Sequence, residues 1–240
     1  MTIRLISDLH LDEKNPALRR AFFAYLDSLP ADTEALYILG DFFEAWIGDD
    51  DDLPFHEKIR QRLKQLTESG IALFFQHGNR DFMVGQEFAK QTGAILLPEA
   101  YILKTAEHKI ALLHGDSLCI DDVEYQQFRA QMRNPDVQAM LMSQSLEERR
   151  ALAQSLRDNS KEANSNKAED IMDINQAELE KVMLELDVQT LIHGHTHRPA
   201  THTFELQGKA CQRIVLGDWG ESAWQIIIDG DKLTLSEFSI

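Results

Sequence analysis

The stretch Leu191-Ile192-His193-Gly194-His195-Thr196-His197 places three imidazoles within five residues, directly after an apolar, strand-like run. Side chains two residues apart on extended backbone point to the same side, so we expect His195 and His197 to face together. Gly194 lets the backbone bend close to whatever these rings hold. The pattern predicts that this stretch closes a metal site built from several loops.

Four earlier strand-like runs end in potential metal ligands of the same kind. The runs and the residues that follow them are 3–6 with Asp8 and His10, 35–39 with Asp41, 71–75 with Asn79, and 109–113 with His114. Open α/β sheets bind their ligands at the carboxyl ends of the strands. We therefore expect these five side chains to meet His195 and His197 in one place.

The rest of the chain alternates between helical and strand-like segments, which predicts an α/β sandwich. Helices are predicted at 19–29, 55–69, 82–92 and 175–186, and further strands at 95–97, 101–103, 188–192, 212–216, 224–228 and 232–238. The turns at Gly217-Asp218 and Asp229-Gly230-Asp231 suit antiparallel pairing of the last three strands. The acidic run 49–52 is predicted to be a solvated loop that can include a helix cap, in preference to a metal site.

Residues 121–173 have a different character, because helix-forming segments rich in Met and Leu replace the strand signals. We predict one domain over residues 1–240 with a helical insertion at about 121–173 that covers a substrate. Most of the apolar side chains of the insertion are expected to pack its helices against each other. A surface rich in Met and Leu can also adapt to flexible apolar ligands.

The composition excludes several classes of protein. A net charge of −16 argues against nucleic acid as a partner, because affinity for a duplex comes mostly from Lys and Arg. Two cysteines outside any C-x-x-C motif exclude a disulfide framework and a thiolate zinc site. The N-terminus enters a strand without a signal-like segment, and no run of about 18 apolar residues occurs. We expect a cytoplasmic protein, with membrane-surface association open.

The types of ligand restrict which metal ions could bind and which reactions those ions could support. Oxygen and imidazole ligands without thiolate suit Mn²⁺, Fe²⁺, Co²⁺ or Zn²⁺. Seven ligands are too many for one such ion and fit two ions that share a bridge, for which Asp41 is the natural candidate. Two ions roughly 3.5–4 Å apart clamp a phosphoryl group and activate a water for in-line attack.

The order Asp8-x-His10, Gly40-Asp41, Gly78-Asn79, His114 and Gly194-His195-x-His197 resembles the calcineurin-like metallophosphoesterases. The resemblance implies a double-sheet α-β-β-α sandwich. It also implies two metal sites that share one carboxylate. The first would be formed by Asp8, His10, Asp41 and His197, and the second by Asp41, Asn79, His114 and His195.

One position departs from the pattern of that family. The family usually has Gly-Asn-His-Asp/Glu, in which the histidine assists the leaving group, whereas this chain has Gly78-Asn79-Arg80-Asp81. Arginine cannot act as a general acid at neutral pH, but it holds phosphate oxygens well. A leaving group that is itself a phosphate needs little protonation, so Arg80 favours a pyrophosphate substrate over an alkyl ester.

Several longer stretches of sequence resemble one particular family within this larger group. Residues 36–41, 44–50, 77–82, 159–164 and 193–199 are together similar to the UDP-2,3-diacylglucosamine pyrophosphatases of lipid A biosynthesis, over nearly the whole chain. That resemblance implies two Mn²⁺ and hydrolysis of UDP-2,3-diacylglucosamine to UMP and 2,3-diacylglucosamine 1-phosphate (lipid X), by water attack on the α-phosphorus. It also implies a Gram-negative source and peripheral contact with the cytoplasmic face of the inner membrane.

The same resemblance assigns further residues. The catalytic set would be Arg80, Asn79 and His195, and the substrate-binding set would be Asn79, Arg80, Asp122, Ser160, Asn164, Lys167 and His195. Ser160, Asn164 and Lys167 follow an i, i+4, i+7 spacing, which places them on one face of a helix. They could meet the sugar and its phosphate, while the apolar insertion covers two acyl chains.

Two other functions remain open at this point. The chain could be another phosphodiesterase of the family that acts on a nucleotide or nucleotide sugar, although Arg80 and the insertion speak against it. It could also be a non-catalytic scaffold, although such proteins tend to lose ligands and all seven positions are filled here. No obligate protein partner is evident from the sequence.

Overall fold

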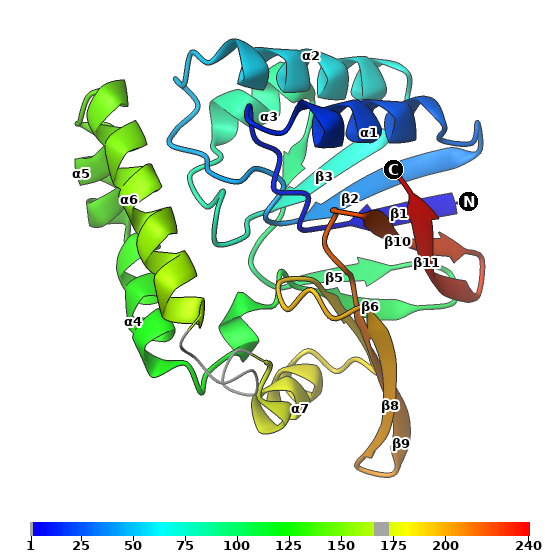
Figure 1. Cartoon of the computed structure of the whole chain (residues 1–240). Coiled ribbons are helices and arrows are strands. Elements are labelled where there is room, and N and C mark those ends of the chain that lie inside the picture. The colour runs from blue at the N-terminus through cyan, green and yellow to red at the C-terminus, as the bar shows by residue number, and fades with distance from the viewer. Residues whose placement is uncertain (1, 166–172) are drawn as a thin grey trace.

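Two β-sheets form the centre of the molecule, and the chain builds part of the first sheet, then the second, then completes the first (Figure 1). The computed structural model describes residues 2–165 and 173–240, and of residues 161–165 it describes the backbone alone. The first sheet, in the order β11-β10-β1-β2-β3-β4, contains β1 (Thr2–Ile6), β2 (Thr33–Leu39), β3 (Ala72–Gln76), β4 (Ile95–Leu96), β10 (Ser222–Asp229) and β11 (Lys232–Ser239). The second, in the order β5-β6-β7-β9-β8, contains β5 (Tyr101–Lys104), β6 (Lys109–Leu112), β7 (Thr190–His193), β8 (Ala200–Leu206) and β9 (Lys209–Val215).

The strands that precede the predicted ligands are parallel within each sheet. In the first sheet, β1, β2 and β3 pair in parallel, and in the second sheet β6 pairs in parallel with β7. Parallel neighbours end at the same edge of a sheet, so the polar residues after each strand gather at one edge. This strand arrangement agrees with the predicted gathering of these residues at strand ends.

Helices cover the outer face of each sheet, which completes an α-β-β-α sandwich (Figure 1). The helices α1 (Pro16–Asp27), α2 (Pro54–Glu68) and α3 (Gln86–Thr92) lie on the six-stranded sheet, and α7 (Gln176–Glu185) lies on the five-stranded sheet. In α2 the buried Phe55, Ile59, Leu63 and Leu66 recur at spacings of three and four, which turns one apolar face toward the sheet. The predicted fold class is confirmed.

The space between the sheets is filled by apolar side chains from both. Leu5 and Leu39 from the first sheet and Leu112 and Ile192 from the second are completely buried in this cluster. Burial of each such side chain contributes about 1.5–3 kcal/mol. The two sheets are therefore held face to face, and their strand ends keep a fixed relation.

The segment after β6 forms three helices that stand to one side of the sheets (Figure 1). They are α4 (Val123–Met132), α5 (Pro135–Met142) and α6 (Leu146–Ser165), preceded by a 3₁₀ turn at Asp116–Leu118. Met132 and Leu141 are buried among these helices, whereas Met140 is 56% exposed and Met142 is 42% exposed. Met140 and Met142 are therefore exceptions to the packing that is expected for most of these apolar residues.

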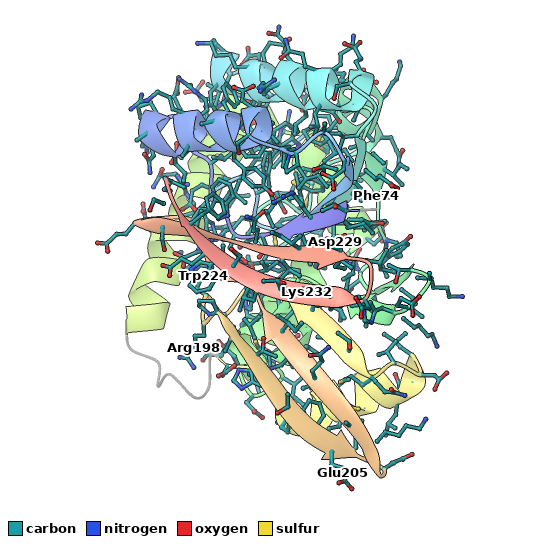
Figure 2. The ribbon with its side chains drawn as sticks, turned by 90° about the vertical axis from the view of Figure 1, so that its right-hand side faces the viewer. Phe74, Arg198, Glu205, Trp224, Asp229 and Lys232 are labelled. Carbon is teal, nitrogen blue, oxygen red and sulfur yellow. The ribbon has the colours of Figure 1, made fainter. Side chains whose placement is uncertain are left out.

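Two predictions about the C-terminal strands are wrong. Strand β8 was not predicted, because it is an edge strand whose exposed face carries polar residues and which lacks a continuous apolar run. The turn at Gly217-Asp218 does not join an antiparallel pair, since β9 before it and β10 after it lie in different sheets. Figure 2 shows the two real hairpins, β10–β11 with Asp229 and Lys232 at its turn and β8–β9 with Glu205 near its tip.

Gly194, just after β7, lies where the ends of the two sheets meet. Its backbone N–H donates to the His114 carbonyl at 2.8 Å. A methyl group at this position would overlap the Asp8 carboxylate and the Ser7 hydroxyl, both at the end of β1. Only a residue without a side chain lets these strand ends come so close.

Replacing Gly194 by alanine is expected to lower the free energy of unfolding by about 1–3 kcal/mol, because the added methyl group overpacks a filled site. Gly220→Ala is the matched control, since no heavy atom lies within 4 Å of the added carbon there, and its effect should stay within about 0.5 kcal/mol. Urea unfolding of both variants measures the difference. Equal stabilities would contradict the close approach at Gly194.

Candidate metal centre

The residues predicted as ligands do not lie on extended backbone. Left-handed φ angles occur at Asp8 (56°), His10 (48°), Asp41 (49°), His195 (66°) and His197 (53°). Such conformations are uncommon for residues with side chains and concentrate at functional sites, where the surrounding structure holds them. Here the His10 backbone N–H donates to the Asp41 carbonyl at 3.0 Å. The extended backbone predicted at His195 and His197 is therefore wrong.

Asp8, His10 and His197 form a first group, in which one ligand atom from each residue lies within 4.8 Å of the others. The Nε2 atoms of the two histidines are 3.3 Å apart, and His197 Nε2 lies 3.4 Å from Asp8 Oδ1. The other Asp8 oxygen accepts hydrogen bonds from the Ser7 hydroxyl at 2.5 Å and from the His195 backbone N–H at 2.9 Å. One carboxylate oxygen and two imidazole nitrogens thus converge.

A second group contains Asp41, His114 and His195, whose ligand atoms also lie within 4.8 Å of one another. Asn79 completes it, because its Oδ1 is 3.0 Å from His114 Nε2 and 2.9 Å from His195 Nδ1. His114 Nε2 is 3.6 Å from Asp41 Oδ1. The structure therefore divides the seven predicted ligands between two neighbouring groups.

The second group fits a cation on the chemistry of its donors. His114 Nδ1 lies 2.9 Å from the Leu39 carbonyl oxygen, which can only accept, so Nδ1 carries a proton. In a neutral imidazole Nε2 then presents a lone pair to Asn79 Oδ1, which also has only lone pairs to offer. A positive charge between them, supplied by a metal ion or by a second proton on His114, would satisfy both lone pairs.

Burial and charge shape the titration of both groups. Burial alone would raise the pKa of Asp8, but His197 and the other imidazoles hold it well below its usual range. Burial lowers the pKa of His197, yet Asp8 and Asp218 raise it to about 9. Burial and the neighbouring His114 lower the pKa of His195 to about 4. His195 is therefore neutral at physiological pH and keeps a lone pair for a ligand.

His193, the third histidine of the motif, points elsewhere. It is completely buried, and its Nδ1 lies 2.8 Å from the Gly194 carbonyl oxygen. Burial and the charge of Arg213 lower its pKa to about 3. It joins neither group of potential ligands.

Two adjoining cavities open at the site. The polar one, of about 310 Å³, is lined by His10, Asp41, Asn79 and His195 together with His197. The other, of about 380 Å³, extends between the core and the helices α4 to α6, and most of its lining is apolar. The side chains shared by both cavities are Asn79, Arg80, Asp122, Tyr125 and Ser160.

The structure describes the side chains of only some of the predicted substrate-binding residues. Arg80, Asp122 and Ser160 lie at the junction of the two cavities, beside Asn79 and His195. The Asn164 side chain and the whole of Lys167 lie outside the described residues. Their predicted contact with the substrate therefore stays a prediction.

Asp116 is a site residue that the sequence analysis passed over. It is buried, and its Oδ2 accepts hydrogen bonds from the Tyr125 hydroxyl at 3.0 Å and from Arg129 Nε at 2.7 Å. Arg133 contacts the same oxygen at 3.3 Å and donates to the Gly78 carbonyl at 3.1 Å. Asp116 thus ties α4 to the loop that carries Asn79. Its spacing two residues after His114 is the signal that could have revealed it.

Asp218 is a second such residue. No role was expected for the segment 217–220 from the sequence, but Asp218 Oδ2 lies 3.7 Å from His197 Nδ1. The backbone N–H of the adjacent Trp219 donates to the Asp8 carbonyl at 3.1 Å. The segment 217–220 therefore contacts two members of the first group, His197 and Asp8.

The prediction for the acidic run 49–52 holds in part, because Asp50 and Asp52 are exposed whereas Asp51 is buried. Asp49 accepts hydrogen bonds from the backbone N–H groups of Gly85 and Phe88, each at 2.9 Å, at the start of α3. Asp50 pairs with Arg149 of α6 at 2.5 Å. Asp51 is buried, contacts His56 at 3.1 Å and also pairs with α6. The run therefore fastens the insertion helices to the core.

Comparison with known proteins agrees with this architecture. The family model described as calcineurin-like phosphoesterase matches residues 1–199. The protein named UDP-2,3-diacylglucosamine hydrolase from Cellvibrio japonicus is 48% identical over 240 residues, which is 100% of both chains. Proteins of the same name from Marinobacter nauticus (93% of this chain and 92% of that one) and Chromohalobacter salexigens (96% and 94%) are each 47% identical. The chain belongs to the calcineurin-like phosphoesterases and, within them, to the UDP-2,3-diacylglucosamine hydrolase family.

Proposed function

We propose that this chain hydrolyses the pyrophosphate bond of UDP-2,3-diacylglucosamine to UMP and 2,3-diacylglucosamine 1-phosphate, a step of lipid A biosynthesis. The observation that carries the proposal is the junction of the two cavities. The cavity lined by two groups of potential metal ligands adjoins a mostly apolar cavity, and the two share five lining residues. A substrate whose pyrophosphate is joined to an acylated sugar matches both cavities.

Two metal ions would be held by the seven ligands. Asp8, His10 and His197 would hold the first, Asn79, His114 and His195 the second, and Asp41 would be shared. Mn²⁺ is the proposed ion, because carboxylate, amide and neutral imidazole ligands suit it. When bound, such ions polarise a phosphoryl group and lower the pKa of water. The water would attack the α-phosphorus.

Arg80 would hold the phosphate oxygens of the substrate. Its side chain lines both cavities, and its buried Nε has no hydrogen-bond partner among the described residues. The planar guanidinium can donate two parallel hydrogen bonds to phosphate. It would stabilise the charge that develops as the phosphate leaves, with Asn79 and His195 close to the same phosphoryl group.

The larger cavity would take the acylated sugar. Asp122 and Ser160 lie where the sugar would bridge the two cavities, and Asn164 and Lys167 are proposed to join them. Beyond this point Phe128, Leu152 and Leu156 line the apolar part. The acyl chains would lie against them, because each buried methylene contributes about 0.8 kcal/mol.

Membrane contact follows from the chemistry of this substrate. An acylated sugar resides in a lipid bilayer, so the chain is proposed to work peripherally at the cytoplasmic face of the inner membrane. Within residues 2–165 and 173–240, no helix is long and apolar enough to cross a membrane. The exposed apolar side chains of α4 and α5, among them Val123 and Met140, support surface contact. Neither nucleic acid nor an obligate protein partner is proposed.

The wild-type chain is expected to bind two Mn²⁺, and His197→Ala is expected to bind one. Loss of that ion removes several kcal/mol of charge stabilisation, so kcat should fall about 10²–10³-fold. Metal analysis after gel filtration and an assay of UMP release measure both quantities. His202→Ala, at an exposed position on β8, is the control and should bind two ions. Two ions in His197→Ala would contradict the first group.

Arg80→Ala should lower kcat by about 10²–10³-fold, the usual cost of removing one donor to developing charge. Arg80→Lys should recover part of the loss, since it keeps the charge but not the two parallel hydrogen bonds. Steady-state kinetics with Arg20→Ala, at an exposed position, as control measures this. An Arg80→Ala chain with unchanged kcat would exclude a role for this guanidinium in the reaction.

Removal of both acyl chains from the substrate should lower kcat/KM by at least roughly 10³-fold, since even six buried methylenes contribute about 5 kcal/mol. Phe128→Ala should lower kcat/KM for the acylated substrate and leave that of the deacylated one unchanged. Equal rates for the two substrates would reject the acyl-chain assignment. They would favour a phosphodiesterase acting on simpler nucleotide sugars.

A further inference from the structure

Glu44 lies beside the first group of potential ligands, although no role was expected for it from the sequence. Its backbone N–H donates to the Leu11 carbonyl at 3.1 Å, and Phe43 forms a parallel bridge with Leu11. The segment after β2 therefore runs alongside the segment that follows His10. This pairing brings the Glu44 side chain, which is 19% exposed, against the His10 ring.

The contact between the Glu44 and His10 side chains bears on which ring nitrogen of His10 carries the proton. Glu44 Oε2 lies 3.1 Å from His10 Nδ1, and an ionised carboxylate can only accept a hydrogen bond. The negative charge at this distance favours the tautomer of a neutral His10 that carries its proton on Nδ1. Its lone pair is then on Nε2, the atom that faces His197 Nε2 at 3.3 Å. Carboxylates that hold a histidine ligand in this way set its tautomer and orientation and raise its basicity.

Glu44 is itself held by a residue of the insertion. Arg157 of α6 places NH1 3.1 Å from Glu44 Oε1 and 3.6 Å from Asp12 Oδ2. The side chain of Arg157 is 15% exposed and lines the larger cavity. Because two carboxylates already neutralise it, Arg157 is a poor candidate for binding phosphate, in contrast to Arg80.

We propose that Glu44 is a positioning residue for His10, and that Arg157 keeps Glu44 in place from α6. The contacts form one continuous path from the wall of the larger cavity, through Arg157 and Glu44, to a ligand of the first group. This inference rests on the metal-binding part of the proposed function. It adds that α6 influences how tightly one of the two ions is bound.

The test is a titration of the metal-free full chain with Mn²⁺, followed by calorimetry. Glu44→Ala should weaken one of the two sites by roughly 10–100-fold, the usual effect of removing such a supporting residue, and leave the other unchanged. Glu44→Gln retains an acceptor for the Nδ1 proton and should lose less. Arg157→Gln should weaken the same site by a smaller factor, because Glu44 remains but is no longer held.

Asp12→Asn is the matched control, since Asp12 contacts Arg157 but not His10. It should bind both ions with wild-type affinity. Thermal unfolding in excess chelator should give the same midpoint for all variants, which separates ligand positioning from general damage to the fold.

Wild-type affinities at both sites in Glu44→Ala would overturn the role of Glu44. Unchanged affinity in Arg157→Gln, together with a loss in Glu44→Ala, would overturn the link to α6. The titration uses no substrate, so an error in the proposed substrate would leave its result unchanged. A wild-type chain that binds no Mn²⁺ would instead reject the metal assignment itself.

Discussion

The buried carboxylate of Asp8 joins the two sheets at the point where the site forms. It follows β1 of the first sheet, accepts a hydrogen bond from the His195 backbone N–H of the second sheet at 2.9 Å, and lies 3.4 Å from His197 Nε2. A buried charge of this kind is tolerated only when it is paired and hydrogen-bonded. The close approach at Gly194 makes that pairing possible, and both groups of ligands depend on it.

The site combines two kinds of support. The ligand loops are held by the sheets, whose strands end at common edges, and by local hydrogen bonds that keep left-handed residues in place. The insertion helices reach the same loops through charged side chains. Asp116 connects α4 with the Gly78-Asn79 turn, and the acidic run 49–52 connects α6 with the core. The polar and apolar cavities therefore share one rigid boundary.

Much of this could be predicted from the sequence, because the strongest signals are local. Apolar runs that stop abruptly at Asp, Asn or His mark strand ends, and their order along the chain identifies the family. What was missed depends on contacts between distant residues. The role of Glu44 arises only when the segment after β2 pairs with Leu11, and the ion pairs of Asp50 and Asp51 require α6 to fold back. Strand β8 has no apolar run because its outer face is exposed to water.

The two-residue spacing of His195 and His197 did not predict their backbone conformation. His195 and His197 lie in different groups, as the family resemblance implies, and their backbone is left-handed rather than extended. The ends of β1, β2, β3, β6 and β7 bring the members of each group together.

The most direct test of the central claim is anomalous X-ray scattering at the manganese edge from crystals of the Mn²⁺-loaded protein. The account predicts two peaks per chain, one between Asp8, His10 and His197 and the other between Asn79, His114 and His195, with Asp41 adjoining both. A single peak, or peaks away from these side chains, would contradict it.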